Sequence, residues 1–256
     1  MMASPVTASR SRRPAMFAGI AVFLGLWEAA ARTGLIPAIL VPPPSSVVAA
    51  FQKEAGSGMW LTYVVASLGH YSAGVLIGSV LGITLGVASA LWPLVEASQE
   101  GIARLLRPIP PIAWIPFAII WFGVTEGAAA FIIAIGVFWL NYFAANTAVK
   151  GVDRGLIELA HAFGQGSLVK RLLKVVLPGA APGLFSGLRA GLGMGWIAVL
   201  AAELFGISGI GQRMMEASGV LATDIVLLYM ATIALLYAIF DGAVIWVAER
   251  TLRWTH

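Results

Sequence analysis

Long runs of apolar residues, separated by short charged segments, dominate the sequence. Six of these runs are long or apolar enough to cross the hydrocarbon core of a bilayer, which takes about 20 helical residues. They cover residues 15–31, 71–91, 107–123, 127–147, 180–204 and 225–248. The pattern predicts an all-α, polytopic membrane protein with about six transmembrane helices.

The segments between the runs predict how the chain is organised. A short N-terminal tail is expected to precede a single transmembrane domain, in which two groups of core spans flank a long inner loop. In chain order the expected parts are the tail 1–14 and the domain 15–256, with its first span 15–31, outer connection 32–70, core spans 71–147 and 180–248, and loop 148–179. Within the outer connection, Ser45 or Ser46 is expected to cap a short helix, and Trp60 to His70 to lie along the membrane interface.

Composition supports a membrane protein. Of the 256 residues, 59% are hydrophobic and 11% are charged, against about 45–50% and about 25% in soluble domains. This excludes a soluble enzyme, a disordered linker and a nucleic-acid-binding domain. The 29 Gly, 13 Pro and unbroken apolar runs favour helices over a barrel, whose strands alternate apolar and polar residues. No cysteine is present, which excludes disulfides and thiolate metal sites. The three scattered histidines speak against a metal site.

The distribution of basic residues predicts the orientation. With the N-terminus inside, the inner segments hold twelve Lys and Arg residues and the outer segments hold three. The inner ones are Arg10, Arg12, Arg13, Arg104, Arg107, Lys150, Arg154, Lys170, Arg171, Lys174, Arg250 and Arg253; the outer ones are Arg32, Lys53 and Arg213. Both termini are therefore expected to be cytoplasmic. This asymmetry accounts for most of the net charge of +4, so nucleic acid is not needed as a partner.

Glycine and proline mark two unusual features of the spans. Two spans carry a glycine at every fourth position, which lets neighbouring helices approach closely and could also provide a face on which helices slide. These ladders are Gly74, Gly78, Gly82 and Gly86, and Gly183, Gly187, Gly191 and Gly195. Four prolines within nine residues, Pro108 to Pro116, rule out a regular helix there. Such a break indicates either a translocation pathway or the point where the chain enters the membrane.

Polar and aromatic residues inside the spans are candidates for lining a pathway. An ionisable group at membrane depth is a functional candidate by default. Arg189 lies near mid-depth of its span, where it could contact an anion or form a structural ion pair with Asp241. The full candidate set is Trp139, Asn141, Asn146, Arg189, Trp196 and Glu203.

The longest inner loop, residues 148–179, predicts a helix-turn-helix. A first helix through Leu156 to Phe163 meets a break at Gly164-Gln165-Gly166-Ser167. Ser167 is expected to cap a second helix, Leu168 to Val176, that stops at Pro178. Because the second helix has a basic and an apolar face, it favours docking to another protein.

The same loop resembles the EAA loop of ABC importer permeases. The similarity rests on Glu158-Leu159-Ala160, followed after three residues by Gly164 and finally by Leu177-Pro178. Two features depart from the family pattern: Leu159 replaces its first alanine, and the gap before Leu177 is one residue longer. Further motifs are similar to the nitrate/sulfonate/taurine branch over roughly residues 20–254. They include Val41-Pro42-Pro43-Pro44, Ile109-Pro110-Pro111-Ile112-Ala113-Trp114-Ile115-Pro116, Trp121-Phe122-Gly123, Gly187-Leu188-Arg189 and Ala202-Glu203.

This resemblance implies a type I importer permease in the inner membrane. Family members form a two-fold pore from two copies, receive a small anion (a sulfonate, taurine, nitrate or an organic acid) from an external binding protein, and work by alternating access. The chain has no G-x-x-x-x-G-K-[ST] phosphate loop, so no catalytic residue or cofactor is expected in it, and ATP and Mg²⁺ belong to two partner ATPase subunits. The coupling residues that the resemblance implies are Glu158, Leu159, Ala160, Gly164, Gln165, Gly166, Ser167, Leu177 and Pro178.

The residues alone leave other classes open. An ion-coupled secondary transporter could use Arg189, Glu203 and Asp241, and its uptake would depend on an ion gradient instead of ATP. An intramembrane enzyme lacks support, because no H-E-x-x-H motif and no paired intramembrane aspartates occur. A channel is disfavoured because no charged ring or carbonyl filter is evident.

Overall fold

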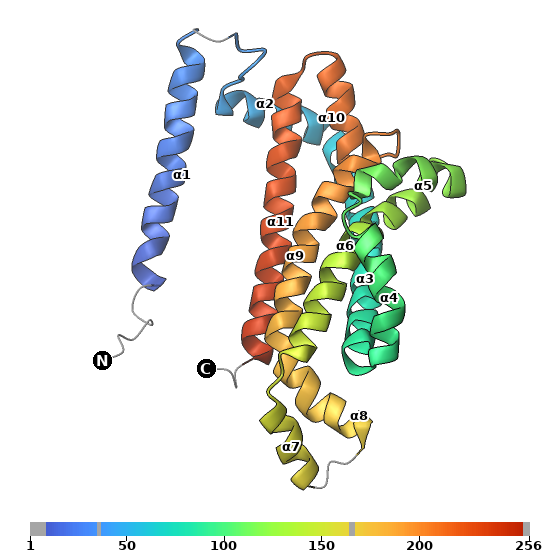
Figure 1. Cartoon of the computed structure of the whole chain (residues 1–256). Helices are drawn as coiled ribbons and strands as arrows, with labels where there is room; N and C mark the ends of the chain where they lie inside the picture. The colour runs from blue at the N-terminus through green and yellow to red at the C-terminus, as the bar shows by residue number, and fades with distance from the viewer. Residues whose placement is uncertain (1–8, 35–36, 164–166, 253–256) are drawn as a thin grey trace. The chain divides into compact units, whose positions relative to one another are not determined.

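The computed structural model describes residues 9–34, 37–163 and 167–252, and the regular elements of this part are all helical (Figure 1). The chain divides into two compact units. One comprises Met1–Leu61 and Met214–Ala231, and the other comprises Thr62–Arg213 and Thr232–His256.

In the first unit, α1 (Ser9–Arg32) covers the first expected span and is followed by α2 (Pro44–Gly56). The helix α2 begins one residue before the serines expected to cap it, with Pro44 in its first turn, where its missing N–H costs nothing. The cap comes from another helix: the Glu28 carboxylate accepts hydrogen bonds from the Ser45 N–H (3.0 Å) and the Ser45 hydroxyl (2.9 Å). Neither serine therefore supplies the expected side-chain cap.

Four helices in the described residues are long and apolar enough to cross a membrane. They are α3 (Met59–Leu91), α6 (Glu126–Lys150), the continuous run from Leu168 to Glu203 that ends in α9 (Leu177–Glu203), and α11 (Thr223–Thr251). Each contains one of the expected core spans. The helix α10 (Ile210–Gly219) connects α9 to α11.

The prediction that Trp60 to His70 form a separate segment along the membrane interface is wrong. These residues form the first turns of α3, a single helix of 33 residues, which is about 50 Å long and exceeds the hydrocarbon core. The helix continues because Trp60 to His70 contains no proline and its one glycine, Gly69, does not interrupt it.

The expected third span, 107–123, is not a helix of crossing length. The helix α4 (Pro93–Leu106) ends before the proline cluster, and a 3₁₀ turn, η1 (Pro111–Trp114), leads into the eight-residue α5 (Ile115–Phe122). The two helical parts meet at an angle of 92°. Proline lacks an N–H and its ring clashes with the preceding turn, so the cluster breaks the helix as the sequence predicts, but the bend replaces the straight crossing.

The prediction that the second helix of the loop stops at Pro178 is also wrong. After α7 (Arg154–Ala162), α8 (Leu168–Arg171) leads through a π-helical segment, η2 (Leu172–Val176), directly into α9. Pro178 lies in the first turn of α9, directly after the π segment, and a first turn is the position in a helix where proline is tolerated. Figure 1 shows α7 and α8 projecting beyond the ends of α6 and α9.

The helix α6 lies between the two glycine ladders (Figure 1). On one side, a Cβ added to Gly78 of α3 would meet the Ala134 carbonyl oxygen of α6 at 2.5 Å. On the other side, Gly187 of α9 faces the Ala144 side chain of α6. The ladders therefore serve the close packing expected of them, with α6 as the shared partner. The last member, Gly195, packs against Tyr71 of α3 instead.

Candidate functional site

The six candidate pathway residues do not converge on one site. Arg189 donates two hydrogen bonds to Asp241 of α11, Nε to Oδ1 at 2.7 Å and a terminal nitrogen to Oδ2 at 2.8 Å. The structural ion pair considered from the sequence is therefore confirmed. Arg189 also lines a cavity of about 420 Å³ between α9 and α11, with Ser186 and Glu249 among its walls.

Glu203, in contrast, is completely buried and belongs to a polar cluster. Its carboxylate accepts hydrogen bonds from the Ser67 hydroxyl (2.7 Å) and the Gly211 N–H (2.8 Å), and His70 Nδ1 lies 3.0 Å away. Ser67 accepts in turn from the Ile210 N–H at 2.8 Å. The cluster joins α3, the end of α9 and the start of α10, so Glu203 fixes these three elements together.

Two glycines make room for this carboxylate. A Cβ on Gly209 would overlap the Glu203 carboxyl group, and one on Gly211 would lie 2.8 Å from its Cβ. The segment Ser208–Gln212 thus has glycine at positions 209 and 211 because a side chain at either position would collide with the buried Glu203.

Ser67, His70 and Glu203 are the residue types of a hydrolytic triad, but their geometry differs from one. In a triad the histidine accepts the serine proton while the acid orients the histidine. Here the Ser67 hydroxyl donates directly to Glu203, and all three side chains are buried. The arrangement suits a structural junction and not nucleophilic attack.

Asn141 and Trp196 belong to the packed core. Asn141 is 1% exposed, and its Nδ2 donates a hydrogen bond to Ser79 Oγ of α3 at 3.3 Å. The same nitrogen lies so close to α9 that a Cβ added to Gly191 would be 2.6 Å from it. Trp196 stacks on Tyr71 with ring centroids 4.4 Å apart. Both residues hold α3, α6 and α9 together instead of facing a cavity.

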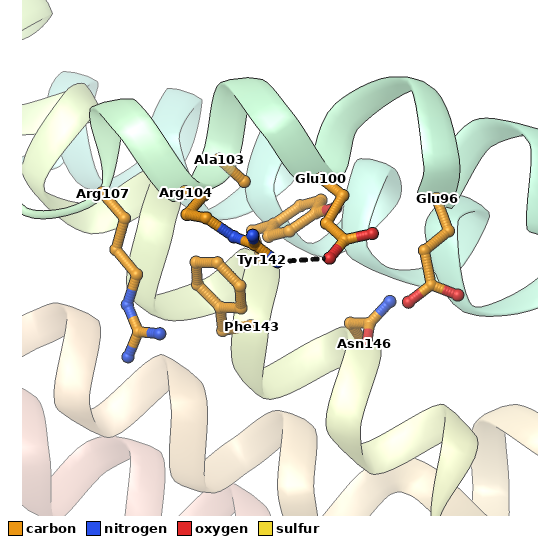
Figure 2. A pocket seen from close by; sticks show the side chains of 8 residues that line it. All are labelled: Glu96, Glu100, Ala103, Arg104, Arg107, Tyr142, Phe143 and Asn146. Atoms are coloured by element: carbon orange, nitrogen blue, oxygen red, sulfur yellow. Dashed lines mark hydrogen bonds and ion pairs between the residues drawn. The ribbon is translucent and has the colours of Figure 1, made fainter.

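Trp139 and Asn146 do line cavities, on the face of α6 that carries Phe143. Asn146 lines a charged cavity of about 310 Å³ below α4 (Figure 2). Trp139 lines a second cavity of about 230 Å³ beside the proline break. Arg107 contributes to both cavities, although the sequence marked it only as an inner basic residue. The signal that could have found it is its position between an amphipathic helix and the proline cluster.

The expected coupling residues that the structure describes lie on α7, directly before α8 and at the start of α9. Glu158 and Leu159 are exposed on α7, whereas Ala160 is buried. Ser167 is the N-cap residue of α8, but its side chain makes no capping hydrogen bond. Gly164, Gln165 and Gly166 lie outside the described residues. Leu177 and Pro178 begin α9, directly after the π segment.

An apolar stripe runs along α7. It consists of Leu156 and Leu159 of α7 and of Phe163 directly after it, which follow at helical spacing and are 49%, 53% and 76% exposed. On the other side of the loop, Leu172 and Val176 pack into a core with Val149 and Val152 at the end of α6. The loop is thus anchored to the end of α6 by a packed core, whereas the apolar stripe itself is exposed.

Comparisons with known proteins agree on one family. The chain is 33% identical to the taurine transport system permease protein TauC of Escherichia coli (strain K12), over 92% of this chain and 87% of that protein. It is 30% identical to the bicarbonate transport system permease protein CmpB of Synechocystis sp., over 78% and 74% of the two chains. A chain of the MetNI methionine ABC transporter, solved in inward-facing conformations, shares the fold with a TM-score of 0.59 at 24% identity, covering 78% of this chain and 98% of that one.

Residues 78–253 match the family described as binding-protein-dependent transport system inner membrane component. This match covers more than half of the chain, and the helical fold, the spans and the relatives all agree with it. The chain therefore belongs to this family: it is a multi-pass inner membrane protein and a permease subunit of an ABC importer.

Proposed function

We propose that two copies of this chain form the pore of an importer for a small anion. A binding protein on the outer side delivers the substrate, and two ATPase subunits, which bind ATP and Mg²⁺, drive alternating access from the cytoplasm. Permeases named for taurine and bicarbonate are similar to this chain along most of its length, and both of these solutes carry an anionic group. That shared group is the basis for proposing an anion.

The observation that carries the coupling to an ATPase is the apolar stripe of α7. Three large apolar side chains at the protruding end of the second unit are exposed, and Lys170 and Lys174 on the neighbouring helical segment are exposed as well. Burying such side chains against a partner contributes about 1.5–3 kcal/mol each. We infer that this surface seats in the ATPase and that the residues Glu158 to Ser167 transmit its movement to α9.

The coupling can be tested by co-purification from native membranes. The tagged wild-type chain is expected to retain an ABC ATPase, identified by mass spectrometry. Leu159→Asp places a charge in the stripe and is expected to lower the retained ATPase about tenfold or more, because about 1.4 kcal/mol corresponds to a factor of ten.

Val220→Asp is the matched control, because Val220 is equally apolar and 76% exposed but lies between α10 and α11. It is expected to retain the ATPase at the wild-type level. A wild-type chain that purifies alone, with uptake driven by an ion gradient, contradicts the proposal.

A further inference from the structure

The strongest unassigned feature is a pair of cavities that meet at Arg107. The charged cavity of about 310 Å³ and the more apolar one of about 230 Å³ share two wall residues, Arg107 and Phe143. The second cavity continues along Trp139 and the prolines of the break. Arg107 is thus the charged residue that the two cavities have in common.

The other charges at this place are already paired. Arg104 donates to Glu100 at 2.7 Å, and Lys150 forms an ion pair with Glu96. In Figure 2 the Arg104 side chain runs toward Glu100, whereas Arg107 points away from that pair. Four charged side chains line the cavity, and among the described residues Arg107 is the one of them that has no ion-pair partner.

Arg107 keeps its hydrogen-bonding capacity. Its guanidinium carbon lies 4.3 Å from the ring centroid of Phe143, and within the described ranges no side chain accepts a hydrogen bond from it. A guanidinium has five N–H donors in a planar fork that matches the oxygens of an anion. Stacking on an aromatic ring orients the group without using these donors.

Arg189, for which the sequence left open an anion contact or an ion pair with Asp241, differs from Arg107 in this respect. Both carboxylate oxygens of Asp241 accept hydrogen bonds from it, so its charge is neutralised and its fork is occupied. An anion that binds there would therefore compete with Asp241 for the charge of Arg189.

We propose that Arg107, oriented by Phe143, is the residue of the permease that contacts the anionic group of the substrate. The ligand class is a small oxyanion such as a sulfonate, and the volume of about 310 Å³ is at the lower end of the usual range for small-molecule pockets. The proposal deepens the transport function proposed above, since it names the pore residue that meets the transported anion.

The absence of cysteine from the chain allows a direct test. In Asn146→Cys the single thiol lies in the charged cavity, one helical turn from Phe143. Its rate of reaction is measured in membranes with 2-sulfonatoethyl methanethiosulfonate, an anionic sulfonate, and with the trimethylammonium reagent of the same size. The ratio of the two rates reports the local charge and cancels differences in accessibility.

Adding Arg107→Gln is expected to lower the anionic-to-cationic rate ratio about fivefold, because one positive charge near the thiol is lost. Arg107→Lys keeps the charge and is expected to preserve most of the ratio. Millimolar methanesulfonate is expected to slow labelling by the anionic reagent when Arg107 is present and not in Arg107→Gln.

Arg189→Gln in the same background is the control and is expected to leave the ratio unchanged. An unchanged ratio in Arg107→Gln, a loss in Arg189→Gln instead, or a thiol that reacts with neither reagent overturns the proposal. The assay needs neither the ATPase nor the binding protein, so its failure is separate from a failure of the co-purification test.

Discussion

Gly209 packs so closely against Glu203 that a side chain at this glycine would overlap the carboxyl group. The carboxylate is fully buried and is surrounded by Ser67, His70 and the Gly211 N–H. Because a buried carboxylate must be hydrogen-bonded to be tolerated, the connection from α9 to α10 is held where these donors can reach it. The contact explains why this segment has glycine at both positions.

Gly209→Ala is expected to destabilise the protein. The added Cβ cannot be accommodated without displacing Glu203 from its donors, and overpacking of this kind costs about 1–3 kcal/mol. The measurement is thermal unfolding of the purified chain in detergent, followed by tryptophan fluorescence. Gly219→Ala is the control, since nothing lies within 4 Å of a Cβ at Gly219. Equal midpoints for the two variants would contradict the packing argument.

The glycine ladder of α3 predicts opposite effects for two glycines on the same helix. Gly78→Ala is expected to lower thermal stability, because its Cβ would lie 2.5 Å from the backbone oxygen of Ala134, which cannot move independently of α6. Gly69→Ala meets no atom within 4 Å and is expected to be neutral or stabilising by up to about 1 kcal/mol, because alanine is the better helix former.

If Gly78→Ala is as stable as the wild type, α3 and α6 do not pack as closely as the structure shows. Thermal unfolding of both variants under the same detergent conditions decides this point.

The pair between Arg189 and Asp241 predicts non-additive mutations. The Arg189 side chain is 45% exposed and that of Asp241 17%, so Arg189→Ala and Asp241→Ala are each expected to lower the unfolding midpoint only slightly. The double variant is expected to be more stable than the sum of the single effects predicts, with a coupling energy of about 0.2–1 kcal/mol. A double-mutant cycle of thermal stabilities measures this coupling, and strict additivity would show that the pair is not formed.

The sequence correctly predicted a break in the third apolar segment, but it did not predict that the chain bends there instead of crossing the membrane as one helix. Four prolines exclude a regular helix at any depth, and this follows from local chemistry alone. Whether the chain bends back or continues in the same direction depends on what packs around α5. The structure places Ile115 and Ala118 in a core with Ile132 of α6, and this packing sets the 92° bend.

Pro178 shows the limit of local rules at a helix end. Proline after a short amphipathic helix usually marks its stop, and the same rule failed here because a π segment precedes it. Nothing in the residues Leu172 to Val176 distinguishes a π turn from an α turn. In the folded chain, Leu172 and Val176 pack with Val149 and Val152, which lie far away in the sequence.

By itself, the sequence determined the helical membrane fold, four of the crossing helices, the ladders that permit close packing, and the family. These features depend on the length and spacing of residue types, which are properties of the chain. Which polar side chains form hydrogen bonds or ion pairs with one another, and which could still bind a ligand, depends on the tertiary structure. It buried Glu203 with its donors, paired Arg189 with Asp241 and, within the part of the chain that the structure describes, left the Arg107 side chain without an ion-pair partner, because the partners come from distant segments and meet only when the helices pack.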